Sequence, residues 1–232
     1  NNTSIQTNTL SGGNPDLSPE TGNTTTAGVI WQPTFTSWIE GLQVALDWYD
    51  IKIEDRVDRL LAQRIVDECE ANGIMCDRIQ RDAATGQLLN VFQNFQNLSS
   101  AAVSGTDLEV SWQTEPNFFD SQSESFSLRW LGARLKELST TAFGGSPLDT
   151  VGALGTPEYT HVMTLGYNVG PYSVQMQNRF IDSTLRDIKW VEGVDVDDNT
   201  VASMSWWNAK LGYSGELNNG TAWNVNLNIQ NV

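Results

Sequence analysis

Basic side chains are scarce in this sequence. Its 232 residues include 13 lysines and arginines against 28 aspartates and glutamates, which gives a formal net charge of −15. Nucleic-acid binding is therefore not expected, because it needs clustered Lys and Arg to release counterions from phosphates. No apolar run approaches the ~20 residues of a membrane-spanning helix. Aromatic residues, in contrast, are plentiful, and the 9 Trp, 5 Tyr and 8 Phe argue against a disordered chain.

The main pattern that is present is alternation of apolar and polar side chains. In residues 223–229 every second side chain is apolar and each one between is an asparagine. Seven further segments alternate in a similar way: 27–31, 42–48, 108–112, 126–130, 159–167, 172–176 and 207–213. Alternation of this kind predicts strands with two unlike faces. We therefore expect an all-β, antiparallel fold of about eight strands.

The connections between these strands alternate strictly in length. Short ones cover 33–40, 113–124, 170–171 and 216–220, and long ones cover 50–99, 136–158 and 181–200. In an up-and-down sheet this order places every short turn at one end and every long loop at the other. That arrangement is typical of a transmembrane β-barrel with short periplasmic turns and long extracellular loops. Helical spacing of apolar residues over 58–71 also predicts one short amphipathic loop helix.

Aromatic residues gather toward both ends of the expected strands, as the two girdles of a membrane barrel do. Those near the short turns are Trp31, Trp112, Tyr167, Tyr172, Tyr213 and Trp223, and those toward the long loops are Trp48, Tyr49, Tyr159, Phe180 and Trp207. The same aromatics also fit the core of a β-sandwich. A secreted carbohydrate-binding sandwich therefore stays open as an alternative, and so does a self-contained eight-stranded barrel that acts as an adhesin. The small, polar second face would pack a narrow interior poorly, which favours an arc of a wider barrel.

Cys69 and Cys76 flank an Asn72-Gly73 turn signal in the first long loop. In a loop that faces an oxidising exterior, two cysteines this close predict a disulfide. Two free thiols remain the alternative, and a zinc site would need ligands that this loop does not supply. The acidic stretch 195–199 lacks the glycine and glutamate of a calcium-binding loop, so we expect no metal site there.

Signatures of catalysis are few. The only histidine, His161, shares a strand face with Met163 and Leu165, so it would not lie beside a nucleophile. The sequence has no Gly-x-Ser-x-Gly elbow, no phosphate-binding Walker loop and no His-Glu-x-x-His motif. We expect neither an enzyme nor a cofactor.

Four segments resemble TonB-dependent receptors. Residues 14–20 (NPDLSPE) resemble the family's N-P-x-L-x-P-E segment, and residues 41–53 (GLQVALDWYDIKI) look like its "sl.vdyydI.i.d" segment. Residues 69–110 are similar to its "C...R....G.i......N...a...G.dle..y" stretch, and residues 227–232 (LNIQNV) resemble its penultimate barrel strand. These segments follow one another in the family's order and cover essentially the whole chain.

The resemblance implies that residues 1–232 are the C-terminal portion of a barrel of about 22 strands, with the plug domain and the last strand absent. It also implies a receptor in the outer membrane of a Gram-negative bacterium that imports a scarce nutrient. Candidate ligands are siderophore-bound iron, cobalamin, haem and oligosaccharides. The expected partners are outer-membrane lipid, the ligand and, through the plug, the TonB energy-transducing complex.

Ligand contacts are expected on the polar, lumen-facing side of the strands. The candidates are Arg129, Gln175, Gln177, Arg179, Asn208 and Lys210. A basic residue inside an acidic protein would steer an anionic ligand such as a metal–siderophore complex. The alternative is that such a residue pairs with a lumenal carboxylate such as Glu109.

Overall fold

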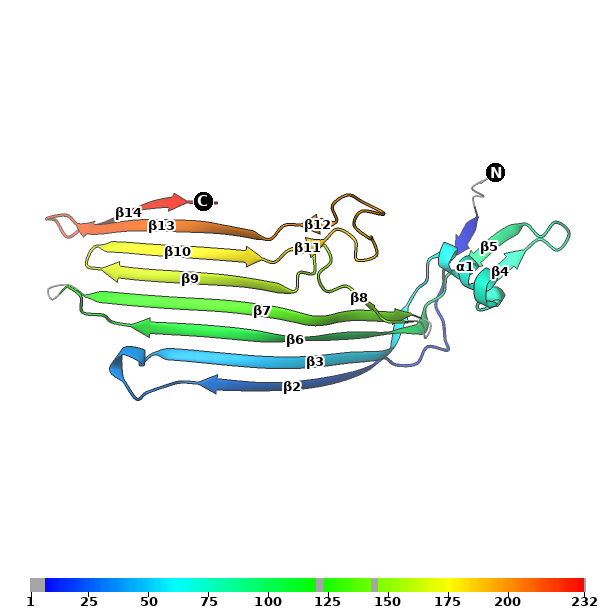
Figure 1. The fold of residues 1–232 in the computed structure, drawn as a ribbon, viewed down its shortest axis with the longest axis horizontal. Coiled ribbons are helices and arrows are strands. Elements are labelled where there is room, and N and C mark those ends of the chain that lie inside the picture. Colours follow the sequence, from blue (N-terminus) through cyan, green and yellow to red (C-terminus); the bar gives the residue numbers. More distant parts are fainter. Residues whose placement is uncertain (1–6, 120–122, 143–145, 232) are drawn as a thin grey trace. The chain divides into compact units, whose positions relative to one another are not determined.

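The computed structural model describes residues 7–119, 123–142 and 146–231. One antiparallel sheet dominates it, and each of its eight main strands pairs with the next one along the chain (Figure 1). These strands are β2 (Thr21–Trp31), β3 (Leu42–Asp58), β6 (Gln96–Thr114), β7 (Glu124–Ala142), β9 (Tyr159–Val169), β10 (Tyr172–Ile181), β13 (Met204–Glu216) and β14 (Ala222–Ile229). A further short strand, β8 (Leu148–Asp149), pairs with β7. The expected number of strands and their up-and-down order are confirmed.

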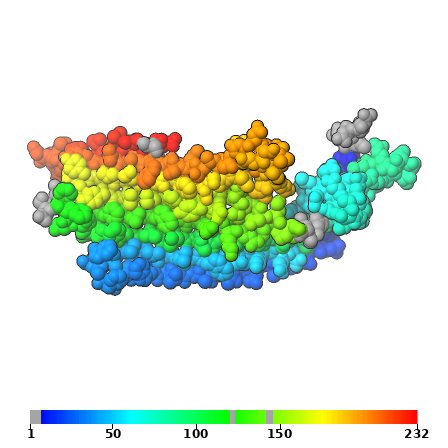
Figure 2. Space-filling model, in the orientation of Figure 1, coloured from blue at the N-terminus to red at the C-terminus, as the bar shows by residue number. Residues whose placement is uncertain are grey.

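The chain forms two compact units. The first, called here the loop unit, comprises the described parts of Asn1–Asn23, Lys52–Ala101 and Thr140–Leu148. The second, the sheet unit, comprises Thr24–Ile51, Ala102–Ser139 and the described part of Asp149–Val232. Figure 2 shows the strands of the sheet unit following one another in chain order.

Strand register in the sheet unit separates an apolar face from a polar face. Leu211 of β13 lies opposite Val174 of β10 and Leu227 of β14. One position along, Gly212 pairs with Ser173 and Asn226, and these residues point to the other side. The alternation seen in the sequence is thus repeated from strand to strand.

No second layer of the described chain covers the apolar face of the last strand. Val225 is 61% exposed and Leu227 is 56% exposed. In a β-sandwich, these side chains would be core residues with little exposure. The uncovered stripe therefore contradicts the sandwich alternative.

Three strands extend farther than the alternation predicts. β3 runs to Asp58, β6 begins at Gln96 and β7 runs to Ala142, so the loops expected at 50–99 and 136–158 were drawn too long. From residue 50 the alternation changes phase, because charged residues replace the apolar ones at even positions and Ile51 and Ile53 stand at odd positions. The apolar stripe of 42–48 therefore ends there, although the backbone pairing continues. The third long connection contains the small ladder of β11 (Thr184–Leu185) and β12 (Thr200–Val201).

The loop unit has a small core of its own. Strands β1 (Asn8–Leu10), β5 (Leu88–Phe92) and β4 (Ile79–Arg81) form a three-stranded sheet, and helix α1 (Ala62–Asn72) contacts β5. Ile65 of α1 is 3% exposed and Val91 of β5 is 1% exposed. The expected loop helix is confirmed, but it begins at Ala62 rather than at residue 58 because β3 extends to that point. None of the helices in the described ranges is long and apolar enough to span a membrane.

Candidate lumenal ligand site

Five of the six predicted ligand residues are neighbours on the polar face of β10 and β13. The register places Gln175 opposite Lys210, Gln177 opposite Asn208 and Arg179 opposite Trp206. The sixth, Arg129 of β7, belongs to the same row of residues. It pairs with Thr164 of β9, which pairs in turn with Gln177. The structure therefore brings all six candidates onto one face; whether they bind a ligand stays a prediction.

Amide groups line a small hollow of about 190 Å³ at this place. Gln175, Gln177, Asn208 and Lys210 contribute to its walls together with β14 and the residue after it. The side-chain oxygen of Asn208 accepts a hydrogen bond of 3.0 Å from the backbone N–H of Asn231. Amides offer both donors and acceptors, so the hollow can hydrogen-bond a ligand rich in hydroxyl or amide groups.

Both arginines of the predicted site already have partners. Nε of Arg129 donates to the carboxylate of Glu109 over 3.1 Å, which is the pairing that the sequence left open as an alternative. The guanidinium of Arg179 lies 5.9 Å from the ring centroid of Trp206. The attraction that Arg129 exerts on an anion is therefore largely offset by its own carboxylate partner.

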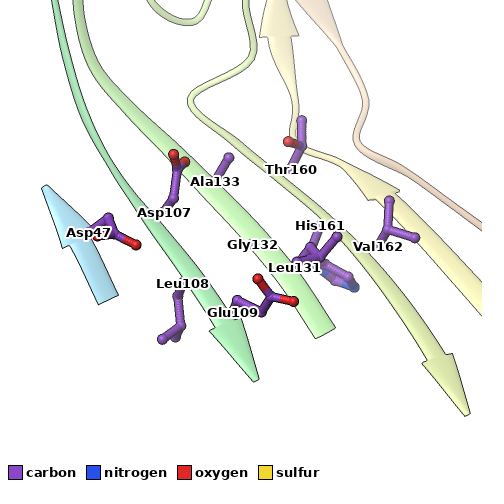
Figure 3. Close-up of a pocket in the computed structure, with 10 residues that line it drawn as sticks. All are labelled: Asp47, Asp107, Leu108, Glu109, Leu131, Gly132, Ala133, Thr160, His161 and Val162. Atoms are coloured by element: carbon purple, nitrogen blue, oxygen red, sulfur yellow. The ribbon is translucent and has the colours of Figure 1, made fainter. Parts of the chain in front are cut away.

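A second hollow on the polar face was missed by the sequence analysis. It has a volume of about 380 Å³, and Figure 3 shows Asp47, Asp107 and Glu109 among the residues around it. Its other walls come from Leu108 of β6 and from β7 and β9, including Leu131 and Thr160. Asp47 lies between the apolar-face residues Leu46 and Trp48, so its polar-face position was readable from the alternation. Its proximity to Asp107 was not readable, because that depends on the register between strands.

Aromatic residues on the apolar face form contacts near both strand ends. Near the short turns, Tyr213 lies 4.9 Å from Tyr172 and 5.3 Å from Trp223 between ring centroids. Toward the long loops, the ring of Phe180 lies 6.0 Å from that of Tyr159. Tyr49 does not belong to this second group. It lies over Gly105 and points to the polar face, because it alternates with Trp48 along β3.

His161 lies on the apolar face, as expected from its neighbours in sequence. Its ring stacks on Phe180 at 5.3 Å, and its Nε2 lies 2.9 Å from the side-chain oxygen of Asn178. The amide nitrogen of Asn178 donates to Ser205 Oγ and to the carbonyl of Trp206. The Asn178 oxygen must therefore accept, and Nε2 of His161 is the donor. This arrangement links β9, β10 and β13 and contains no nucleophile paired with the imidazole.

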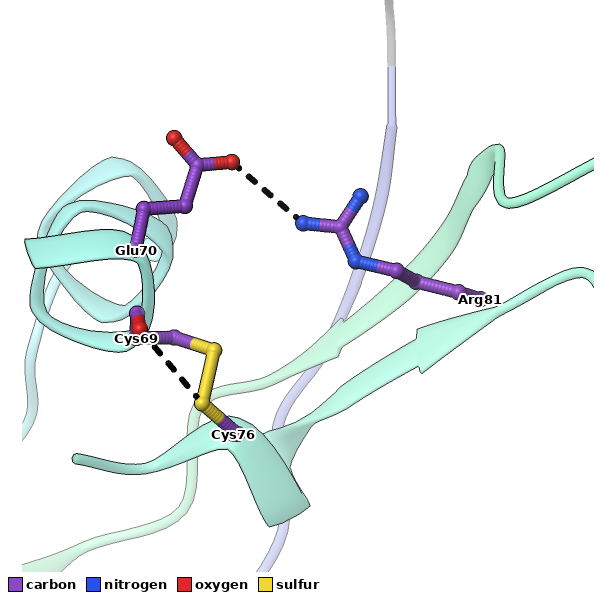
Figure 4. Close-up of a disulfide and its surroundings, with 4 residues drawn as sticks. All are labelled: Cys69, Glu70, Cys76 and Arg81. Carbon is purple, nitrogen blue, oxygen red and sulfur yellow. Dashed lines mark hydrogen bonds and ion pairs between the residues drawn. A yellow bond between two sulfur atoms is a disulfide. The ribbon is translucent and has the colours of Figure 1, made fainter. Parts of the chain in front are cut away.

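Cys69 of α1 and Cys76 of the 3₁₀ turn η2 (Cys76–Arg78) form the predicted disulfide, with their Cα atoms 4.9 Å apart (Figure 4). Beside it, Nη2 of Arg81 lies 3.4 Å from a carboxylate oxygen of Glu70. The covalent link and the ion pair connect the helix to the strand that follows it.

The NPDLSPE segment fastens the start of β2 within the loop unit. The side chain of Asn97 accepts from the N–H of Ser18 over 2.8 Å and donates to the carbonyls of Ser18 and Asp55. The carboxylate of Glu20 accepts from the N–H of Val57 over 2.7 Å. The backbone of Ser18 is thus bound by a side chain of the loop unit, and the side chain of Glu20 by a backbone N–H, which gives the segment a structural role.

The acidic stretch 195–199 is likewise fastened to backbone. The buried amide of Asn199 donates to the carbonyls of Asp187 and Trp190, and Asp195 accepts from the N–H of Val191. Over the described residues, no group of three or more His, Cys, Asp or Glu side chains could hold a metal ion.

Comparison with protein families gives one match over the whole chain. The family model described as TonB dependent receptor-like, beta-barrel, matches residues 1–232. Comparison with curated proteins and with solved structures gives no match.

Proposed function

This chain belongs to the TonB-dependent receptor β-barrel family, and we propose that it forms the C-terminal part of the barrel in a receptor that imports a scarce nutrient with energy from the TonB complex. The family consists of outer-membrane receptors and transporters of Gram-negative bacteria and is not a family of enzymes. The open eight-stranded sheet is an arc of such a barrel, and the plug that couples it to TonB would belong to the longer receptor.

The observation that carries this proposal is the contrast between the two faces of the sheet. The apolar face has an uncovered aliphatic stripe between two groups of aromatic residues, as a surface in contact with lipid requires. The polar face carries a continuous row from Glu109 and Arg129 to Gln177 and Asn208. Placed in a barrel, this row lines the lumen, where the plug and the ligand are accommodated.

The chemistry of the row favours a ligand with many hydroxyl or amide groups. Its hydrogen-bonding groups include the neutral amides of Gln177 and Asn208, and the positive charge of Arg129 is already paired with Glu109. Asp47 and Asp107 add negative charge nearby, which disfavours a polyanionic ligand. Of the four ligand classes, oligosaccharides and cobalamin match this surface better than strongly anionic iron chelates.

The test uses the full-length receptor in the outer membrane of a host that lacks its own copy. The double variant Gln177→Ala/Asn208→Ala removes two adjacent amides, and each hydrogen bond lost costs about 0.5–1.5 kcal/mol, so ligand binding should fall about tenfold. The matched control is Asn90→Ala, since this amide donates to an exposed glutamine side chain in the loop unit. Binding of a panel of labelled ligands to intact cells is the measurement.

Two results would contradict the proposal. Uptake that persists at full rate when the TonB complex is deleted would exclude energised transport. Equal binding by the double variant and the control, at equal amounts of receptor in the membrane, would remove the polar row from the ligand site.

A further inference from the structure

An aromatic hollow lies on the apolar face where the short turns are. Its volume is about 590 Å³, and its walls include Trp38, Trp112, Phe118, Phe126 and Tyr167. All of these residues belong to the sheet unit. We refer to this feature as the turn hollow. It is separate from the polar-face site because Trp112, Phe126 and Tyr167 occupy apolar-face positions of β6, β7 and β9.

The turn hollow is built from parts that are held in place. Trp112 and Phe126, on neighbouring strands, contact edge to face with their ring centroids 5.3 Å apart. Glu124 is buried, and its carboxylate accepts from the hydroxyl of Tyr167 and from the backbone N–H of Phe119, each over 2.6 Å. The same carboxylate thus fixes one wall residue and the backbone next to Phe118. The walls formed by Trp112, Phe126 and Tyr167 are therefore held by contacts within the chain.

Two of the aromatic wall residues are largely exposed, which would be unfavourable in a turn that faces water. Trp38 is 67% exposed and Phe118 is 76% exposed. Concave apolar surfaces of this size mark binding sites. Because the short turns of an outer-membrane barrel are periplasmic and its apolar face meets lipid, the turn hollow opens at the level of the periplasmic leaflet. It is continuous with the lipid-facing surface, so its occupant is a lipid of that leaflet.

The polar rim of the hollow indicates which headgroup it accepts. Ser37, Thr114 and Asn117 supply neutral donors, and Glu115 supplies a carboxylate. The sequence has no Lys or Arg in the four short connections, 32–41, 115–123, 170–171 and 217–221. Anionic lipids are recognised by clusters of basic residues, and none is available here. The neutral donors can hydrogen-bond a phosphate, and the carboxylate can pair with an ammonium group. The rim therefore matches a zwitterionic headgroup.

We propose that the turn hollow binds one phosphatidylethanolamine molecule of the periplasmic leaflet. An acyl chain lies against Trp38, Phe118 and the other aromatic walls. The phosphate accepts hydrogen bonds from the neutral rim, and the ammonium pairs with the carboxylate of Glu115. The site would anchor this part of the barrel at a defined depth in the bilayer.

Native mass spectrometry of the full-length receptor tests this site. The receptor is placed in nanodiscs that contain equal amounts of phosphatidylethanolamine and phosphatidylglycerol, and is then released to count the lipids that stay bound. The wild-type protein should retain one phosphatidylethanolamine. Trp38→Ala/Phe118→Ala should lower this retention about tenfold, as expected for loss of two aromatic anchors. The matched control is Trp223→Ala, which removes an aromatic of the same girdle outside the hollow and should retain the lipid.

Glu115→Gln separates headgroup recognition from chain binding. This variant keeps the size of the side chain and removes its charge. A lipid should still bind, but the preference for phosphatidylethanolamine over phosphatidylglycerol should fall about threefold, as expected for loss of an exposed ion pair. Equal retention by the double variant and Trp223→Ala would overturn the proposal, and so would a wild-type preference for phosphatidylglycerol. Heat-modifiable migration on a gel checks folding. If the double variant does not fold, Phe118→Ala and Glu115→Gln decide the question on folded barrels.

Discussion

The loop unit and the sheet unit bury their apolar side chains in different surroundings. In the loop unit, Ile65 and Val91 are almost fully enclosed by protein, and a disulfide links α1 to η2. In the sheet unit, long apolar side chains such as Val225 and Leu227 point outward and stay uncovered by the described chain. One unit excludes water with its own residues, and the other leaves apolar side chains uncovered, which in the proposed barrel would meet the bilayer.

The first prediction tests the dependence of the sheet unit on lipid. Leu211→Arg places a charge on the apolar face, where Leu211 is 41% exposed between Val174 and Leu227. For a lipid-facing position near the bilayer midplane we expect a loss of about 2–4 kcal/mol in the free energy of unfolding. Denaturant unfolding of the full-length receptor in lipid vesicles is the measurement.

Gln175→Arg is the matched control for this prediction, because it introduces the same charge on the polar face of the neighbouring strand, opposite Lys210. We expect a much smaller change for it. If the two variants lost similar amounts of unfolding free energy, the two faces of the sheet would not lie in different surroundings. The comparison between the units would then fail.

The second prediction tests whether the loop unit is stabilised by its own covalent link. Replacing Cys69 and Cys76 by serine opens the short loop, which should destabilise the loop unit by about 2–3 kcal/mol in the chain-entropy model. Amide exchange in α1 should become faster, while exchange in β10 and β13 should stay unchanged. Reduction of the wild-type receptor with a thiol reagent is the control and should reproduce the effect. Equal acceleration in both units would mean that they do not unfold independently.

The strands of the sheet unit were predictable because an alternating sequence directly encodes two unlike surroundings. The faces of Leu211 and Asn208, and the shared face of the six candidate residues, follow from position along the strand alone. The disulfide was predictable because its partners are close in sequence. The parts of β3, β6 and β7 nearest the long loops were not; in β3, for example, the apolar stripe ends at Asp50, where a charged residue takes an apolar-face position.

Features that depend on distant parts of the chain could not be predicted. Asn97 binds Ser18, which is 79 positions away, and no local pattern marks that pair. Asp47 and Asp107 share a hollow only because β3 and β6 are neighbours in a particular register. The turn hollow likewise needs the end of one turn, carrying Trp38, to lie beside another, carrying Phe118. In each case the residue types were visible in the sequence, but their proximity was not.

The smallest expected effect concerns the turn between β4 and β5 in the loop unit. The N–H groups of Ala84 and Thr85 and the Thr85 hydroxyl donate to the carboxylate of Asp82. These hydrogen bonds favour the charged form and lower the pKa of Asp82, with the Thr85 N–H contributing most. Because the pKa is lowered, Asp82 stabilises the turn fully at pH values above the ordinary aspartate pKa of about 3.9. This stabilisation is lost as the pH falls through the lowered pKa of Asp82.

Amide exchange at Thr85, followed as the pH is lowered, measures this effect after correction for the intrinsic pH dependence of exchange. Because Asp82 is only partly buried and these hydrogen bonds stay within the turn, we expect only a local loosening of the turn, with α1 and the strands of the sheet unit unaffected. Asp82→Asn keeps a side-chain oxygen as acceptor but does not titrate, so its Thr85 exchange should lose the pH-dependent step. If the step persists in this variant, another group controls the turn. If lowering the pH loosens α1 to the same extent, the turn is not a separate element within the loop unit.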